Sequence, residues 1–142
     1  MDIINEVKNS FPCHPRFMGT IRDALQKFAD SNDIPMGDRF KLELALDEAC
    51  MNAIDHGSAL NQTMEFDLTL KAYSEKIVIL VKDYGGKAFD PEYFESIAQK
   101  KTWGHGGRGI FLIKKIMDEV MYCFNKDHST LLTMIKYIKK VD

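Results

Sequence analysis

The sequence predicts an α+β fold, a two-layer sandwich in which helices cover one face of a mixed, mainly antiparallel sheet. Segments with strand-like alternation and segments with helical periodicity follow one another in the order βααββ(α)αββ, where the bracketed helix is short. Strand segments also follow each other in pairs through short turns, which is typical of antiparallel neighbours. The chain has 142 residues, enough for one domain with its own core, and we expect residues 1–142 to form a single domain.

The first half of the chain predicts one strand and two helices. Residues 3–11 are expected to form a strand that Pro12 ends. Residues 16–30 place apolar side chains at helical spacing, namely Phe17, Ile21, Leu25 and Phe28. The turn formers of SNDIPMGD separate this helix from a second one, which starts near residue 35 or 38 and runs to residue 55. Gly57 stands where a helix commonly ends.

The second half predicts two strands, a short helix, a longer helix and a hairpin. TMEFDLTLKAY alternates apolar and polar residues, whereas KIVILVKD is more continuously apolar and therefore more buried. Asp90 can begin the short helix, and the polar stretch QKKTWGHGGRG follows it. GIFLIKKIMDEV has the periodicity of an amphipathic helix, and VMYCFN with STLLTMIKYIKK predicts a closing hairpin.

Composition excludes several classes of protein. A net charge of −2 gives no overall attraction to nucleic acid or to an anionic membrane. The longest apolar runs, such as IVILV, are far shorter than the roughly 20 residues of a membrane-spanning helix. The three cysteines are odd in number and widely spaced, as reduced thiols are. With no visible secretion signal, these observations predict a cytoplasmic protein without nucleic-acid or membrane partners.

Two polar side chains lie one turn apart in the second helix, within LALDEACMNAIDHG. At 100° per residue, Leu44, Ala45, Glu48, Asn52 and Asp55 share one face, and Leu42, Leu46, Ala49 and Ala53 share the opposite one. The second set is expected to pack on the sheet and the first to line a cleft. Glu48 could then handle a proton, and Asn52 could offer an oxygen to Mg²⁺. The alternative is that both side chains simply meet water or a backbone partner at the rim of the core.

An aspartate leaves the most apolar strand in DYGGKAFDP. Asp83 could turn its carboxylate into the cleft and accept a hydrogen bond from an exocyclic amine, with Gly85 allowing a flat base to approach the backbone. An ordinary glycine turn explains the same residues.

The segment GHGGRG precedes the last helix. Its glycines match G-x-G-x-x-G, but no strand or βαβ unit precedes them, so a dinucleotide-binding fingerprint is rejected. Backbone N–H groups at a helix N-terminus beside Arg108 would still favour an anion. A flexible loop without a ligand is the alternative.

Taken in order, EACMNAIDHG, DYGGKAFDP and GHGGRGIFLIKKIMDEV resemble the three ATP-binding boxes of the GHKL ATPase superfamily. The resemblance is strongest to its anti-sigma-factor serine/threonine kinase branch, the RsbW- and SpoIIAB-like proteins, and it covers nearly the whole chain. It implies a histidine-kinase-like ATP-binding domain with the Bergerat fold, which agrees with the element order derived above.

The resemblance implies a role for each matching residue. Glu48 is similar to the catalytic carboxylate, Asn52 to the Mg²⁺ ligand, and Asp83 with Gly85 to the adenine pocket. The short ATP lid, which holds the phosphates, corresponds to Gly104, Gly106, Gly107, Arg108 and Gly109. Thr130 occupies the position of a threonine that assists adenine binding. The family usually has Gly-Thr there, whereas this chain has Ser129–Thr130 after His128.

The family implies ATP and Mg²⁺ as cofactors and a role in partner switching. Such a kinase phosphorylates an anti-anti-sigma protein of STAS type and sequesters a sigma factor, often as a homodimer. Two alternatives stay open, the first of them because the last box departs from the pattern. One is an interaction module, with or without nucleotide, that sequesters a partner but transfers no phosphate. The other is a stand-alone ATPase or a histidine-kinase-like catalytic domain.

Overall fold

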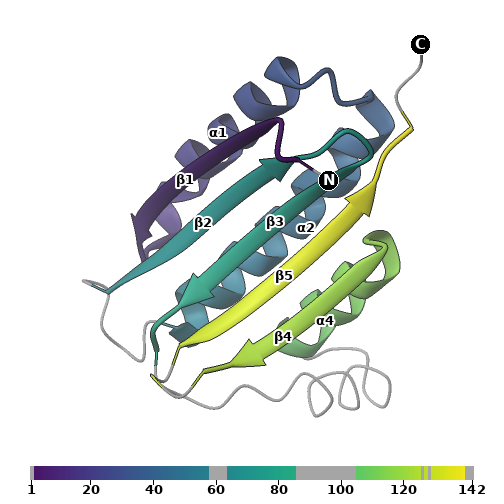
Figure 1. Ribbon diagram of the computed structural model, residues 1–142. Coiled ribbons are helices and arrows are strands. Elements are labelled where there is room, and N and C mark those ends of the chain that lie inside the picture. The colour runs from purple at the N-terminus through teal and green to yellow at the C-terminus, as the bar shows by residue number, and fades with distance from the viewer. Residues whose placement is uncertain (1, 58–63, 86–104, 126, 128, 140–142) are drawn as a thin grey trace.

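The computed structural model describes residues 2–57, 64–85, 105–125, 127 and 129–139, with backbone alone for 56–57 and 105–110. In this part of the chain, a five-stranded sheet forms one layer and three α-helices form the other (Figure 1). The elements, in chain order, are β1 (Asn5–Pro12), a 3-10 turn (Pro15–Phe17), α1 (Met18–Ser31), α2 (Met36–Gly57), β2 (Glu65–Ala72), β3 (Lys76–Asp83), α4 (His105–Ile116), β4 (Glu119–Phe124) and β5 (Thr130–Tyr137).

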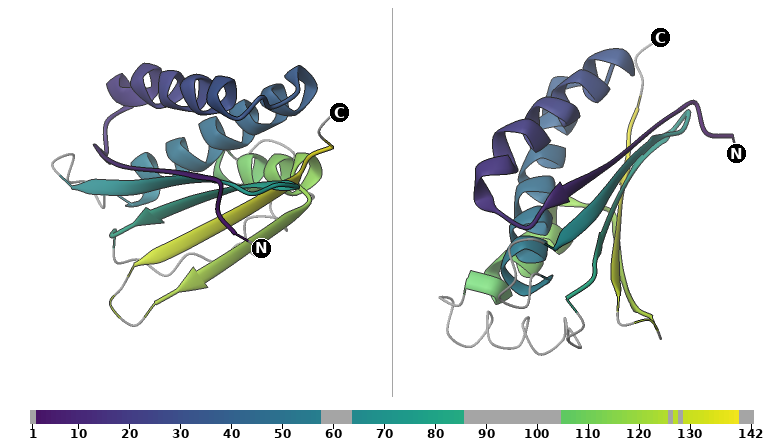
Figure 2. Two further views of the ribbon diagram at one scale, coloured as in Figure 1. Left: turned by 45° about the horizontal axis from the view of Figure 1, so that its top comes forward. Right: turned by 90° about the vertical axis from the view of Figure 1, so that its left-hand side faces the viewer.

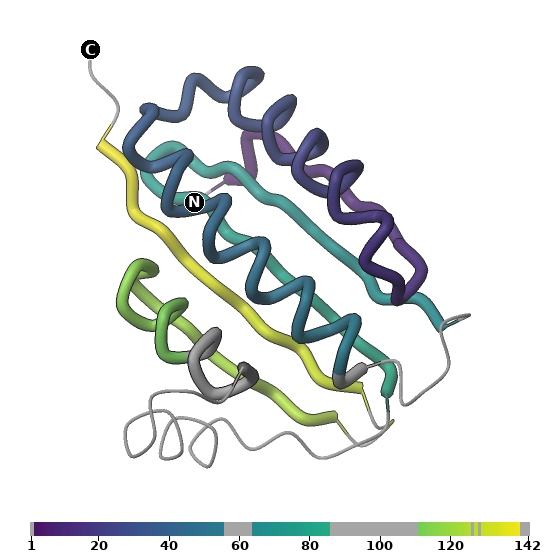
Figure 3. The backbone as a smooth tube through the Cα atoms, turned by 180° about the vertical axis from the view of Figure 1, so that it is seen from behind, coloured from purple at the N-terminus to yellow at the C-terminus, as the bar shows by residue number. Residues whose placement is uncertain are grey.

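The sheet has the strand order β1-β2-β3-β5-β4, and all four pairings described are antiparallel. All three helices lie on one face, and none of the described residues forms a helix on the other face of the sheet (Figure 2). Seen from the helical side, α2 runs along the centre of the sheet between α1 and α4 (Figure 3). The predicted α+β sandwich with a mainly antiparallel sheet is confirmed.

Strand patterning explains which face of the sheet is covered. In β2 the residues Phe66, Leu68, Leu70 and Ala72 are buried, and those between them are more exposed. The buried set faces the helices, because successive side chains of a strand point to opposite faces. The central strand β3 is more continuously buried, as its apolar sequence predicts.

The turn between α1 and α2 is fixed by one arginine. Arg39 donates from Nε to the carbonyl of Ile34 at 2.6 Å and forms an ion pair with Asp30 near the end of α1. Asp33 adopts a φ of 51° in this turn, a left-handed conformation that aspartate tolerates better than most residues. The two helices are therefore held as a hairpin beside the sheet.

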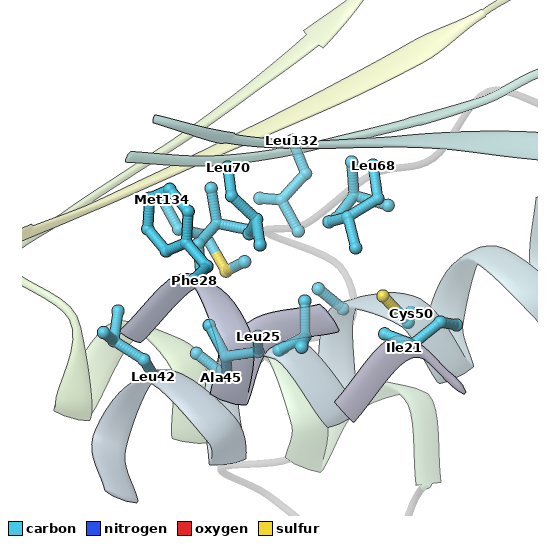
Figure 4. Packing of buried hydrophobic residues seen from close by; sticks show 14 of the residues in the cluster. Ile21, Leu25, Phe28, Leu42, Ala45, Cys50, Leu68, Leu70, Leu132 and Met134 are labelled. Carbon is cyan, nitrogen blue, oxygen red and sulfur yellow. The ribbon is translucent and has the colours of Figure 1, made fainter. Parts of the chain in front are cut away.

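The core lies between the sheet and the helices, where Leu68, Leu70, Leu132 and Met134 of the strands contact the inner faces of α1 and α2 (Figure 4). The predicted inner set of α2 is confirmed, since Leu42, Leu46, Ala49 and Ala53 are all buried. The prediction for Ala45 is wrong. Ala45 has no exposed surface and belongs to this core, because the stripe that α2 buries extends between α1 and α4 and is wider than a single row.

Three predicted boundaries change in the structure, and the first is the start of the last helix, which is His105 where the sequence predicted Gly109. The last helix ends at Ile116, so Glu119 and Val120 open β4 instead of closing the helix. The cause is Asp118, whose N–H donates to the carbonyl of Ile135 and whose carboxylate accepts from the N–H of Tyr137, both on β5. The first strand includes Pro12, which an edge strand accommodates without losing a ladder bond. The short helix expected from Asp90 lies outside the described residues.

Within the described ranges, none of the helices has the length and apolar character needed to cross a membrane.

Candidate functional site

Asp83 and Thr130 lie opposite each other at one end of the sheet. Asp83 is the last residue of β3, Thr130 is the first of β5, and the two are partners in the antiparallel register. Partners in an antiparallel pair direct their side chains to the same face of the sheet. Asp83 is half-buried and Thr130 is buried.

That face is the one covered by the helices. Asp83 follows the buried Val81 at a spacing of two residues, and Thr130 precedes the buried Leu132 at the same spacing. Both polar side chains thus continue inward-pointing apolar rows at the point where the rows end. A carboxylate acceptor and a hydroxyl donor are thereby placed together beside the core.

Helix α2 supplies the next two candidates. Glu48 and Asn52 are both half-buried, whereas Asp55, one turn beyond, is exposed. This gradient is the one expected for a helix that passes from the core into the wall of a cleft. The views agree that the C-terminal end of α2 lies near the end of β3, which is the end that carries Asp83 (Figures 1 and 3).

Cys13 is a buried thiol that lies against α2. Its Sγ lies 4.0 Å from the carbonyl oxygen of Ala53, the residue after Asn52. Burial raises the pKa of the Cys13 thiol, and the negative charges of Asp83 and Glu65 raise it further. Cys13 is therefore a buried neighbour of α2, and the charge of Asp83 disfavours its thiolate. Sequence reasoning did not select it, because its position depends on tertiary contacts that no local motif reveals.

The carboxylate of Asp83 stabilises the turn that follows β3. The N–H of Gly85 donates to the Asp83 carboxylate at 3.3 Å. One oxygen of the Asp83 carboxylate thus stabilises the turn that begins at Asp83. Gly85 has no side chain, so the backbone near Asp83 stays accessible.

The predicted lid is partly described. Helix α4 begins at His105 and packs against α2, so Gly106 and Gly107 lie in its first turn, where N–H groups lack intrahelical acceptors. Gly109 lies two residues beyond Gly107, where its N–H can donate to a backbone carbonyl of the same helix. Gly104 and the side chain of Arg108 lie outside the described residues.

The turn before Thr130 accommodates the departure from the family pattern. Ser129 has no exposed surface, and its Oγ donates to Asp127 at 2.6 Å and accepts from the amide of Asn125 at 3.0 Å. Hydrogen bonds from Ser129 lower the pKa of Asp127. A serine in place of glycine is therefore held inside the turn.

The described residues offer few protein ligands to Mg²⁺. No group of three or more His, Cys, Asp or Glu side chains in the described residues is arranged to hold a metal ion. Mg²⁺ in nucleotide sites usually takes one or two protein oxygens and completes its shell with phosphates and waters. The half-buried carboxamide of Asn52, beside Glu48, fits that limited contribution.

The chain is similar to known proteins over most of its length. The family described as "Histidine kinase-like ATPase domain" matches residues 11–136. The chain is 28% identical to the serine-protein kinase RsbW of Oceanobacillus iheyensis over 142 residues, covering 93% of this chain and 86% of that protein. It is 26% identical to RsbW of Bacillus subtilis over 140 residues, covering 93% and 85% of the two chains.

Two solved structures share the fold. A chain in the SiaB–SiaC complex from Pseudomonas aeruginosa superimposes with a TM-score of 0.66 at 11% identity, covering 96% of this chain and 89% of that one. The histidine kinase AdeS of Acinetobacter baumannii gives a TM-score of 0.52 at 15% identity, covering 96% and 70%. The family match spans most of the chain and includes Glu48, Asn52, Asp83 and Thr130, and the chain therefore belongs to the histidine kinase-like ATPase domain family.

Proposed function

We propose that this protein is an ATP-dependent serine/threonine kinase that acts as an anti-sigma factor in a partner-switching system. Its substrate would be a serine or threonine of a STAS-type anti-anti-sigma protein, and its second partner a sigma factor. The proposal is supported by the relatives named serine-protein kinase RsbW and by the family match. It places the protein in the cytoplasm, with residues 1–142 as one ATP-binding domain that could pair as a homodimer.

The observation that carries the proposal is the convergence of two pairs. Asp83 and Thr130 share the covered face at one end of the sheet, and Glu48 and Asn52 lie one turn apart on the helix that ends nearby. The first pair can bind the polar edge of adenine, because a carboxylate accepts from the exocyclic amine and a hydroxyl can donate or accept. The second pair can serve the phosphate end.

Each residue then has a distinct task. The Asp83 carboxylate orients the base, and Gly85 leaves room for its flat ring. The first-turn N–H groups of α4, at Gly106 and Gly107, would hold phosphate oxygens, together with Gly104, Arg108 and Gly109. Asn52 would hold Mg²⁺, which neutralises phosphate charge when bound. Glu48 would orient the incoming hydroxyl and accept its proton.

Glu48→Gln tests the proposed transfer step, because it keeps the size of the side chain and removes its basicity. We expect MgATP affinity to change less than about twofold and phosphate transfer to fall by roughly 100-fold or more. The assay would use radiolabelled ATP and purified STAS-domain proteins. Glu43→Gln, on another face of the same helix, is the matched control. Transfer by Glu48→Gln at the wild-type rate would refute the role of Glu48.

The second candidate is an interaction module that sequesters a partner without transferring phosphate. The observation that favours it is Ser129, which replaces the glycine expected beside Thr130. Calorimetry with MgATP distinguishes the kinase from a nucleotide-free module, since such a module releases no heat of nucleotide binding. A protein that binds MgATP but labels no STAS partner would support the module over the kinase.

A further inference from the structure

Three strands are joined by one carboxylate on the uncovered face of the sheet. Ser10 of β1 donates from Oγ to Oδ1 of Asp67 on β2 at 2.6 Å. The hydroxyl of Tyr84, the residue after β3, donates to Oδ2 of the same carboxylate. Both oxygens of Asp67 therefore accept a hydroxyl, one from each side. We call these residues the Ser10–Asp67–Tyr84 chain.

This chain lies on the opposite face from Asp83. Asp67 stands between Phe66 and Leu68, which are 0% and 1% exposed and point toward the helices, so its own side chain points away from them. Lys82, its register partner on β3, points to the same face and places its ammonium 5.3 Å from the centre of the Tyr84 ring. Figure 1 shows this face of β1, β2 and β3, with the helices behind the sheet.

Tyr84 extends the link between β3 and β2 beyond the end of their backbone register. The register between β2 and β3 ends at the pair Asp67 and Lys82, whereas the register between β3 and β5 continues to Asp83 and Thr130. The register with β5 therefore extends one residue further along β3 than the register with β2. The bond from Tyr84 to Asp67 ties the next residue back to β2, within the diagonal reach of an aromatic side chain.

Asp83 is consequently held from both faces. On the covered face its carboxylate accepts from the N–H of Gly85. On the uncovered face the adjacent Tyr84 is anchored through Asp67 to β2, and through Ser10 to β1. Rotation of the strand end about its axis would have to break the contact between Tyr84 and Asp67.

We propose that the Ser10–Asp67–Tyr84 chain is a positioning device that sets the direction of the Asp83 carboxylate and thereby the preference for adenine over guanine. This inference rests on the proposed function, because it assumes that Asp83 reads the base. The exocyclic amine of adenine is a donor, whereas guanine presents a carbonyl acceptor at the equivalent atom, so a well-directed carboxylate favours adenine. A carboxylate free to turn would discriminate less.

The test compares two tyrosines in one sheet. Tyr84→Phe removes only the hydroxyl and keeps the ring beside Lys82. Tyr137→Phe is the matched control, since Tyr137 is also an exposed tyrosine that donates to a carboxylate, that of Glu119, but lies at the other end of the sheet. Calorimetry with MgATP and MgGTP would give both dissociation constants for each variant and for the wild type.

For Tyr84→Phe we expect ATP affinity to fall by roughly three- to tenfold, the effect of about one hydrogen bond, with a smaller change for GTP. The ratio of the two affinities should therefore narrow, while Tyr137→Phe keeps the wild-type ratio. Asp67→Ala should narrow the ratio of affinities to the same extent. The double variant should narrow it little further, because both substitutions remove the same hydrogen bond. The rate of phosphate transfer at saturating ATP should stay within twofold of the wild type.

A Tyr84→Phe protein with a lower melting temperature but an unchanged ATP-to-GTP ratio would overturn the positioning role. Asp83→Asn in the same assay distinguishes this failure from failure of the proposed function. If Asp83→Asn loses ATP affinity and Tyr84→Phe does not, only the positioning role fails. If Asp83→Asn binds ATP like the wild type, base reading by Asp83 fails and the positioning role fails with it.

Discussion

Asp83 ends β3 directly opposite Thr130, which begins β5, and the two side chains share the covered face of the sheet. The pair joins the last residue of the central strand to the first residue after the β4–β5 turn. Each position is therefore fixed by a different neighbour, Asp83 by Gly85 and Thr130 by the buried Ser129 turn.

Asp83→Asn should weaken ATP binding by about tenfold or more, since a hydrogen bond to a charged acceptor contributes about 1.5–3 kcal/mol. Asparagine keeps the size of the side chain and one acceptor but loses the charge. Calorimetric titration with MgATP would measure the change, and Asp55→Asn, on the exposed end of α2, provides the control. Unchanged affinity would remove Asp83 as the adenine reader.

Thr130→Val should reduce ATP affinity by about two- to tenfold without unfolding the protein, because it exchanges one hydroxyl for a methyl of similar volume. The matched control is Thr133→Val, whose position in β5 points to the uncovered face, in register with Leu80. Calorimetry would give the dissociation constant of MgATP for each of the two variants. Equal effects in both variants would indicate a general change in β5 and not a contact with the base.

Asn52→Ala should weaken binding of MgATP while leaving binding of metal-free ATP almost unchanged, because the carboxamide is proposed to contact only the metal. The measurement is the ATP dissociation constant with Mg²⁺ and with excess chelator. Lys41→Ala, an exposed residue on the same helix, is the control. An equal loss with and without Mg²⁺ would argue for a direct contact with ATP instead.

Cysteine reactivity offers a test of the site that needs no partner protein. Cys123 is exposed, whereas Cys13 and Cys50 are buried, and burial raises the pKa of both buried thiols. We expect one thiol to react rapidly with a thiol reagent in the folded protein and all three to react after denaturation. Asp83→Asn should speed the slow reaction of Cys13, because removal of that negative charge favours the thiolate. An unchanged Cys13 rate would show that the charge of Asp83 does not act on this thiol.

The hydrogen bond from Tyr84 to Asp67, followed by burial, raises the pKa of Tyr84 from 10.0 to about 12. A raised tyrosine pKa means that folding favours the neutral phenol. The contribution of the Tyr84 hydroxyl to the free energy of unfolding is therefore complete below the unfolded pKa of 10.0. It is lost as the pH rises through about 12. The ultraviolet absorbance of tyrosinate would be titrated in the wild type and in Tyr84→Phe. The difference between the two curves would give the ionisation of Tyr84. Asp67→Asn should shift that titration to lower pH.

Much of the fold could be predicted because periodicity is a local property. The alternation in β2 and the apolar run in β3 identified two strands, and the spacing of apolar residues identified α1. The end of α4 could not be predicted. Its sequence remains helical in pattern to Val120, but Asp118 is bound by the backbone of β5, a contact between residues far apart in the chain.

The candidate site divides in the same way. Glu48 and Asn52 were recognisable because a polar pair one turn apart interrupts an apolar helix, and Asp83 because it leaves an apolar strand. Ser10, Asp67 and Tyr84 carry no such signal. Each is an ordinary polar residue on a strand or at its end, and only the register of three strands brings them together.

The central position of β3 in the order β1-β2-β3-β5-β4 also bears on motion. Amide protons of an interior strand exchange with solvent mainly when the whole domain opens, whereas those of edge strands exchange through local fraying. Ile79 lies in the middle of β3, where the strand is paired to both β2 and β5. Hydrogen exchange should accordingly be slowest around Ile79 and Met134.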